Sequence, residues 1–278
     1  MRHGCPRWKS IVSTYLIRSF FLCVLSVSVL ASELHQEPMP DSVLDYLVYS
    51  NHNAPYQYSD VESGHKGIVC QVVDAIAEEA GLEVHPHMEP IKRMKRSIRS
   101  DRYRHWITYG MRAWENQTDW DKHHFARTNI FRFQPVAVLP KDSSLQLQQL
   151  SDVGAVKVLL IHGFDYGATR SLLINGGAQI DEVDNQQKAL SMLRQGRADL
   201  FIEDGLRIDF ALREMELTKN DFRVVPIMPS SSRFDVTLVM SEDTPKEQIT
   251  LMNDVLARMK NSGELEALVA DSRLDSTL

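Results

Sequence analysis

The sequence predicts an α/β fold of two lobes, each a small sheet with helices on both faces, joined by two crossing strands. From residue 44 onward, short apolar runs alternate with amphipathic segments, which is typical of α/β layering. The order of elements in residues 44–109 recurs in residues 156–205. An extended apolar segment also follows each of these patterns, at 131–140 and at 234–240. One continuous sheet is the alternative interpretation.

The first lobe pattern begins with a strand at 44–49 and a loop at 51–58. Apolar residues at three-to-four spacing predict a helix over 68–80, and Gly81 ends it because glycine takes the left-handed C-terminal position at little cost. The next elements are a strand at 82–85, a short helix marked by Ile91, Met94 and Ile98, and a strand at 105–109. Together they make a βαβαβ unit.

The second lobe pattern begins with a strand at 156–161 and a loop at 162–167. Asp184 or Asn185 is expected to cap a helix that closes at Gly196. A strand at 198–202 follows, with Glu203, Asp204 and Gly205 beyond its end. The plan of the first lobe is therefore repeated.

The extended segments set the predicted domain boundaries. These are a signal peptide at 1–31, the first part of lobe 1 at 32–135, lobe 2 at 136–232, and a return to lobe 1 with C-terminal helices at 233–278. In the last part, Thr244–Pro245–Lys246–Glu247 predicts a capping box with proline at the first helical position. A connection of two strands allows rigid lobes to rotate about a hinge.

The first 31 residues differ from the rest in charge. They contain four basic residues and no acidic one, followed by an apolar run at 20–30. This run is too short to span a bilayer core of roughly 30 Å, and Ala31 suits cleavage by signal peptidase. We therefore expect a cleaved secretory signal peptide, with an uncleaved anchor helix as the alternative.

The charge balance excludes some partners. The chain has 31 basic and 37 acidic residues, and loss of the four basic residues in 1–31 leaves 27 against 37, a net charge near −10. This balance opposes nonspecific binding to nucleic acid or to an anionic membrane.

Loss of residues 1–31 also leaves Cys70 as the remaining cysteine, so no internal disulfide is expected. The expected role of Cys70 is apolar packing rather than thiol chemistry.

Short motifs occur in a fixed order along the chain. They are Ala54–Pro55–Tyr56, the helix-to-strand passage at 67–82, the run 158–163, the run 193–204 containing Gln195–Gly196–Arg197–Ala198–Asp199, and the closing run 259–265. In the order and spacing of these motifs, the chain resembles bacterial family 3 of the type II periplasmic solute-binding proteins, which serves amino-acid ABC transporters. The resemblance implies a hinged, two-lobed receptor without cofactor. It would capture a small polar solute, an amino acid or related amine, and deliver it to an inner-membrane ABC permease.

Loops at the C-terminal ends of strands are the expected ligand site, because ligands of open α/β sheets collect there. These loops are 51–58, 110–114, 162–167 and 203–205. The resemblance assigns Asp204 to the ammonium group of a ligand, whereas the alternative is a helix cap. Glu203 is expected on the opposite face of its strand.

Aromatic residues in these loops are further candidates. Tyr56, Phe164, Tyr166 and Trp114 could enclose an apolar or cationic part of the ligand, with ordinary packing as the alternative.

Two arginines are candidates for a ligand carboxylate. Arg112 could form a bidentate pair with it. Here the chain departs from the family, since Gln117 stands close to where the family carries an arginine. Arg93 is the second candidate, with a solvated surface cation as the alternative.

Enzymatic and metal chemistry have weaker support. The sequence has no Gly-rich phosphate loop, Ser nucleophile elbow or local Cys–His arrangement, and its paired histidines lack a completing ligand set, so no metal or cofactor is expected. An acid–base lyase resembling cyclohexadienyl dehydratase is the enzymatic alternative, through His52, Glu203 and Asp204. A sensor subunit for a membrane signalling receptor is another alternative. We expect the protein to be a monomer.

Overall fold

The computed structural model describes most of the chain beyond residue 41. The described residues are 42–50, 53–60, 64–147, 150–164, 166–227 and 234–271, and all lie in one unit that spans Pro38–Leu278. The predicted signal peptide and His52 lie outside the described residues. Within the described part of the chain, no helix has both the length and the apolar sequence needed to cross a membrane.

The first sheet has the strand order β4-β1-β5-β13-β6, and β7 also pairs with β13. The bounds are β1 Val43–Tyr49, β4 Glu83–Glu89, β5 Trp106–Met111, β6 His124–Phe125, β7 Phe131–Arg132 and β13 Asp235–Met240. β1 is parallel to β4 and β5, while β13 is antiparallel to β5. β1 and β13 lie inside the sheet and are largely buried, which explains their nearly continuous apolar sequences.

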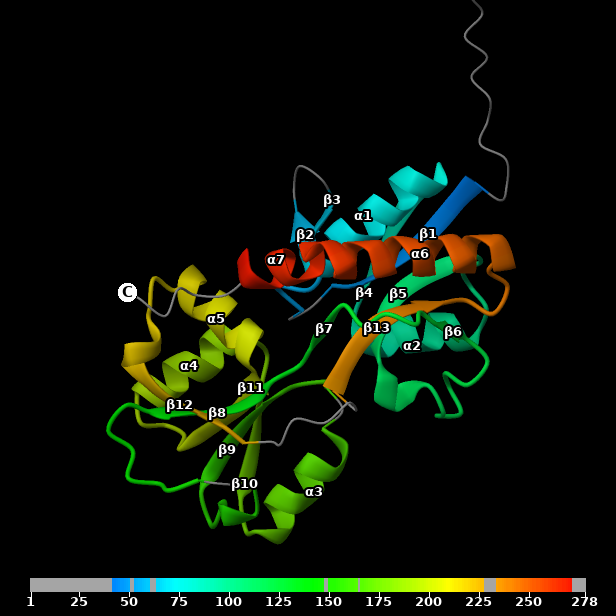
Figure 1. Cartoon of the computed structure of the whole chain (residues 1–278). Helices are drawn as coiled ribbons and strands as arrows, with labels where there is room; N and C mark the ends of the chain where they lie inside the picture. The colour runs from blue at the N-terminus through cyan, green and yellow to red at the C-terminus, as the bar shows by residue number, and fades with distance from the viewer. Residues whose placement is uncertain are drawn as a thin grey trace, which may run out of the picture. The chain divides into compact units, whose positions relative to one another are not determined.

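Helices cover both faces of this sheet (Figure 1). The crossover β1-α1-β4 moves across the sheet in one direction and β4-α2-β5 in the other. Since such crossovers are right-handed, α1 (Ile68–Ala80) and α2 (Ile91–Arg99) lie on opposite faces. α6 (Lys246–Ser262) packs beside α1, and α7 (Glu264–Asp271) packs against α6. α1 ends at Gly81 as predicted, with a left-handed φ of 64°.

The second sheet has the order β10-β9-β11-β8-β12. Its strands are β8 Pro135–Pro140, β9 Lys157–Ile161, β10 Gln179–Val183, β11 Leu200–Asp204 and β12 Phe222–Pro226. Its helices are α3 Gly167–Asn175, α4 Gln186–Arg194 and α5 Gly205–Glu214. β9 is parallel to β10 and β11, and β8 is antiparallel to β11 and β12. The arrangement of the first sheet is thus repeated.

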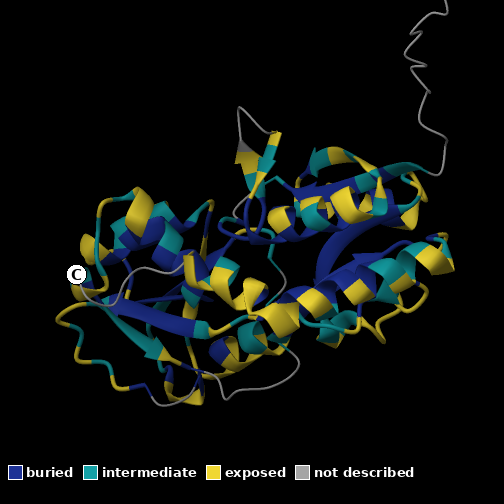
Figure 2. Cartoon of the chain, turned by 45° about the horizontal axis from the view of Figure 1, so that its top comes forward, coloured by how far each residue is buried: buried dark blue, intermediate teal, exposed yellow. Residues whose placement is uncertain are grey.

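The second sheet separates two apolar clusters. One contains residues of α4 and α5, and the other contains Leu173 of α3 and Leu150. Alternate residues of β9 and β11 belong to different clusters, because side chains along a strand point to opposite faces. Figure 2 shows these strands buried beneath helices whose outer faces are exposed. The predicted cap of α4 is Asn185, whose side chain accepts from the Lys188 amide N at 2.8 Å.

Two segments cross between the sheets side by side, as predicted. Phe131 pairs with Val236, and the amide N of Phe133 donates to the carbonyl O of Phe234 at 3.0 Å. Beyond this contact, β8 enters the second sheet while β13 enters the first. The described strands form two larger sheets and the small β2 (Tyr58–Asp60) and β3 (Gly64–Lys66) hairpin, which excludes one continuous sheet.

The capping box predicted at Thr244 is wrong. α6 begins at Lys246, so Pro245 occupies the N-cap position, where it has no side-chain hydrogen bond to offer. The Thr244 hydroxyl instead lies 3.0 Å from the Ser241 hydroxyl. Thr244 is one residue too early to reach the free amides of the first helical turn.

Candidate functional site

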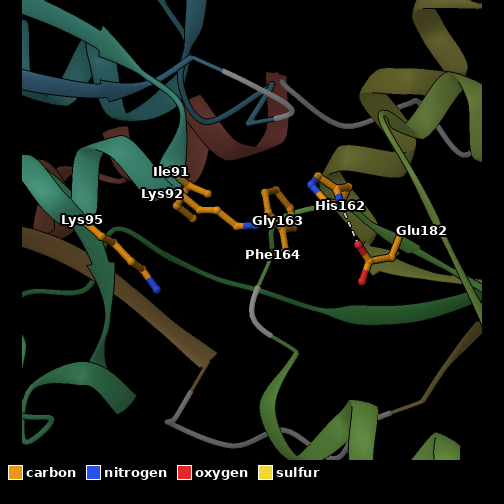
Figure 3. A pocket seen from close by; sticks show the side chains of 7 residues that line it. All are labelled: Ile91, Lys92, Lys95, His162, Gly163, Phe164 and Glu182. Atoms are coloured by element: carbon orange, nitrogen blue, oxygen red, sulfur yellow. Dashed lines mark hydrogen bonds and ion pairs between the residues drawn. The ribbon is translucent and has the colours of Figure 1, made fainter.

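A hollow of about 350 Å³ lies between an element of the first sheet's lobe and elements of the second. Its lining residues are Ile91, Lys92 and Lys95 of α2, His162, Gly163 and Phe164 after β9, and Glu182 of β10 (Figure 3). The segment after β9 is one of the strand ends where the sequence predicts a ligand. A hollow of this volume suits a small molecule.

The sequence of α2 explains why its lysines face the hollow. The buried residues Met94, Ser97 and Ile98 fix one side of the helix against its sheet. The hydroxyl of Ser97 also donates to Oε2 of Glu89 at 2.8 Å, which ties α2 to the end of β4. The side chain of Lys92 extends toward Phe164 in Figure 3. The first half of α2 therefore supplies a cationic wall.

The acidic residue of the hollow is already paired. Glu182 accepts from Nη1 of Arg170 at 2.8 Å through Oε1, and its Oε2 lies 2.7 Å from Nδ1 of His162. These two partners lower the pKa of Glu182, with the His162 hydrogen bond the larger influence. The carboxylate of Glu182 therefore stays ionised, and the charge of Arg170 compensates its negative charge. The lysines opposite leave the hollow electropositive.

A buried cation, Arg207 of α5, lies beside this hollow. Its Nη2 donates to Oδ1 of Asn53 at 2.9 Å, and its Nη1 donates to Oε1 of Glu203 at 3.2 Å. Its guanidinium carbon lies 4.7 Å from the ring centroid of Phe164 and 5.3 Å from those of Tyr56 and Phe133. Such distances are typical of cation–π contacts. Arg207 thus joins residues that follow β1 to residues of β11 and α5.

The Asn53–Tyr56 loop is held to the start of α1. The amide N atoms of Ile68 and Val69 donate to the carbonyl O atoms of Pro55 and Tyr56, each at 3.0 Å. Gly67 allows this approach, since a Cβ there would lie 2.5 Å from the Tyr56 carbonyl O, and its φ of 124° disfavours other residues. The hydroxyl of Tyr109 donates to Oδ1 of Asn53 at 2.9 Å. The loop is therefore positioned from two sides.

Asp204 is fully occupied by the protein itself. As the N-cap of α5 it accepts from the Leu206 amide N at 3.0 Å, and it accepts from the Gln134 amide N at 2.6 Å. The hydroxyl of Tyr56 also donates to it. Burial is the largest influence on this carboxyl and raises its pKa to about 6, while the Tyr56 hydrogen bond and the charge of Arg207 act in the opposite direction.

Three of the predicted site residues come together. Tyr56, Phe164 and Asp204 surround or adjoin Arg207, and Phe164 also lines the hollow. Glu203, expected on the opposite face from Asp204, reaches the same group because Arg207 folds back from the first turn of α5.

Three other candidates have partners within their own lobes. Tyr166 accepts from the Ile161 amide N at 2.9 Å and belongs to the packing of the second sheet. Arg112 donates to Oδ1 of Asn129 at 3.0 Å and to the Ala126 carbonyl. Trp114 stacks on Trp120 with ring centroids 5.1 Å apart. Arg93 is exposed on α2, next to the lysines of the hollow.

The carboxylates of the enzymatic alternative are also bonded within the protein. Oε1 of Glu203 accepts from the Asp204 amide N at 2.8 Å as well as from Arg207, and Oε2 accepts from Nε2 of Gln186 at 2.9 Å. His52 lies outside the described residues. Among the residues that the structure describes, no three histidine, cysteine or acidic side chains are grouped to hold a metal ion.

Sequence patterns alone do not distinguish five residues of this region, which are Arg207, Asn53, Lys92, Lys95 and Glu182. Asn53 lies within a loop predicted to face the ligand, but nothing in its type distinguishes it. One indication for Arg207 was available: it stands among Leu206, Ile208, Ala211 and Leu212, apolar neighbours that predict a buried helix. A cation inside such a helix needs a partner, and Glu203 is the nearby acid.

No protein-family model matches the chain, and no curated protein matches it. Solved structures do match. An ancestral arginine-binding protein bound to arginine is 16% identical with a TM-score of 0.63, covering 83% of this chain and 97% of that chain. The amino acid ABC transporter substrate-binding protein AbpA from Streptococcus pneumoniae, bound to L-arginine, is 17% identical with a TM-score of 0.64, covering 83% and 94%. The second substrate-binding domain of GlnP from Lactococcus lactis, in an open conformation, is 14% identical with a TM-score of 0.56, covering 85% and 97%.

The chain has the fold of the two-lobed type II solute-binding proteins. The predicted fold class is thereby confirmed. The likeness extends over nearly the full length of each of these solved chains.

Proposed function

We propose that this chain is a noncatalytic periplasmic receptor that captures a small polar solute, of the amino acid class, between its lobes. The observation that carries the proposal is the hollow of about 350 Å³, whose walls come from α2 on one side and from β10 and the segment after β9 on the other. A solute in such a hollow touches both lobes, so its binding energy favours the closed form.

The connection between the lobes supports this mechanism. The two antiparallel crossing segments, at Phe131–Phe133 and Phe234–Val236, allow rotation with little change inside either sheet. The closed monomer would then be presented to an inner-membrane ABC permease. The names of the solved structures, two bound to arginine and one a GlnP domain, favour an amino acid as the class of solute.

Thermal melting of the purified protein against a panel of amino acids, amines and small carboxylates tests the proposal. A ligand at about a hundred times its Kd adds about 2.7 kcal/mol to the free energy of unfolding. We expect at least one solute to raise Tm, and Phe164→Ala to reduce the rise because it removes a wall of the hollow.

The matched control is Leu172→Ala, which removes an apolar side chain that is 47% exposed on α3, outside the hollow. It should leave the ligand-induced rise unchanged. A panel without any rise in Tm, confirmed by calorimetry, contradicts the proposal.

A further inference from the structure

Arg207 is bound by the protein in the way that a receptor binds a cationic ligand. Aromatic rings of Tyr56, Phe133 and Phe164 lie within 5.3 Å of its guanidinium carbon. A carboxylate oxygen of Glu203 and an amide oxygen of Asn53 accept from its Nη atoms. Rings against the face and oxygen acceptors at the edge are the two features that recognise a guanidinium group.

We infer that Arg207 is an internal ligand that fills the cation subsite of this receptor, so that the solute held against Lys92 and Lys95 carries a net negative charge. The inference deepens the proposed function and rests on it for the identity of the solute. The assignment of Arg207 itself rests on the contacts above.

No acid of this cluster is left for the ammonium or guanidinium group of a solute. The oxygens of Asp204 accept from Tyr56 and from the amides of Gln134 and Leu206. Those of Glu203 accept from Arg207, from Gln186 and from the amide of Asp204. Arg207 already neutralises one of the two buried carboxylates, and the oxygens of both accept from protein donors. A second cation would therefore have to displace these donors to gain a counter-ion in the cluster.

The hollow beside this cluster offers the opposite charge. Lys92 and Lys95 line it, and neither has an ion-pair partner among the described residues. Glu182 across the hollow is balanced by His162 and Arg170. A carboxylate placed here meets two ammonium groups, whereas an amine meets a single carboxylate that already has two partners.

The charge of the solute can be tested with sets of related compounds that differ in charge. Calorimetry of the full chain would compare L-glutamate with L-glutamine and L-lysine, and succinate with succinamide and putrescine. In every set that binds, we expect the anion to have a Kd at least tenfold lower than its neutral or cationic counterpart. The two sets separate an amino acid from a simple dicarboxylate.

Variants of α2 assign the effect to the lysines. Lys92→Gln and Lys95→Gln should each raise the Kd of the anion about tenfold, with little change for succinamide, which has no carboxylate. Arg96→Gln removes an exposed cation of the same helix outside the hollow, and it should leave both affinities unchanged. A neutral or cationic solute that binds best overturns the inference and leaves the proposed function standing. Failure of every set, while a neutral or cationic solute of the melting panel binds, likewise overturns the inference alone; the proposed function fails only if no solute of that panel binds.

Chemical rescue tests the internal ligand separately. In Arg207→Ala, methylguanidinium at millimolar concentration should fill the vacated subsite and raise Tm, while wild type and Arg207→Lys, whose subsite keeps a tethered cation, should not respond. Where the alanine variant is unfolded, recovery of its near-ultraviolet circular dichroism on adding methylguanidinium is the equivalent readout. An alanine variant that responds no more than wild type overturns the assignment of Arg207.

Discussion

At the scale of single residues, the site contains buried charges that are paired with one another, although Nε of Arg207 is buried without a hydrogen-bond partner. Arg207, Glu203 and Asp204 are each less than 8% exposed, and their partners are protein groups. Burial of an ion pair costs desolvation, and the rest of the cluster must offset it through hydrogen bonds. Sequence spacing predicted Tyr56, Phe164 and Asp204 as members of the site, since each follows the end of a strand. It could not predict that a cation of the chain itself lies among them, because this depends on how the lobes meet.

The pH dependence of stability should report on Asp204. The folded protein holds a proton on this carboxyl with a pKa of about 6, above the ordinary value of 3.8 that applies when the chain is unfolded. Its ionisation therefore costs stability above pH 6, and this cost disappears as the pH falls toward 4.

We expect the stability of wild type relative to Asp204→Asn to rise by roughly 2 kcal/mol from pH 7 to pH 4, measured by urea unfolding of both proteins. A relative stability that is constant with pH, or that falls on acidification, would show that the carboxyl does not carry this cost.

At the scale of elements, the main strands and helices follow from the sequence, whereas the edge strands of the second sheet do not. The apolar pattern predicts β1, β9 and β11, which lie inside their sheets. It does not predict β10 or β12, which are edge strands of the second sheet. β10 exposes Gln179, Asp181 and Glu182, so backbone pairing with β9 rather than apolar burial makes it a strand.

Two glycines at the ends of α1 should respond differently to substitution. Gly81 has a φ of +64° and open space around the position of a Cβ, so Gly81→Ala should cost about 1 kcal/mol from backbone strain alone. Gly67 has both a φ of +124° and backbone oxygens 2.5–2.6 Å from that position. Gly67→Ala should therefore cost roughly 2–4 kcal/mol.

Chemical denaturation measures the loss of unfolding free energy in each variant. Ligand binding then distinguishes the two variants. Only Gly67→Ala should also weaken solute binding, because it displaces the Asn53–Tyr56 loop. Equal costs for the two variants would mean that the close approach of this loop to α1 is absent in solution.

At the scale of the whole molecule, the repeated βαβαβ plan and the paired extended segments predicted a two-lobed α/β protein, and the structure has this form. Repetition of a plan is visible in sequence because it depends on local periodicity. The volume and charge of the hollow are not visible in the sequence, because they arise from residues as far apart in the chain as Ile91 and Glu182. The structure adds an electropositive hollow beside a cation subsite that is already filled.

A crystal structure of the protein with the solute that stabilises it most would show where the solute lies and which groups hold it. We predict electron density for that solute between α2 and the segment after β9, with a carboxylate within hydrogen-bond distance of Lys92 or Lys95 and Arg207 still enclosed by its aromatic rings. Solute density elsewhere on the protein, or density in place of a displaced Arg207, would contradict the account.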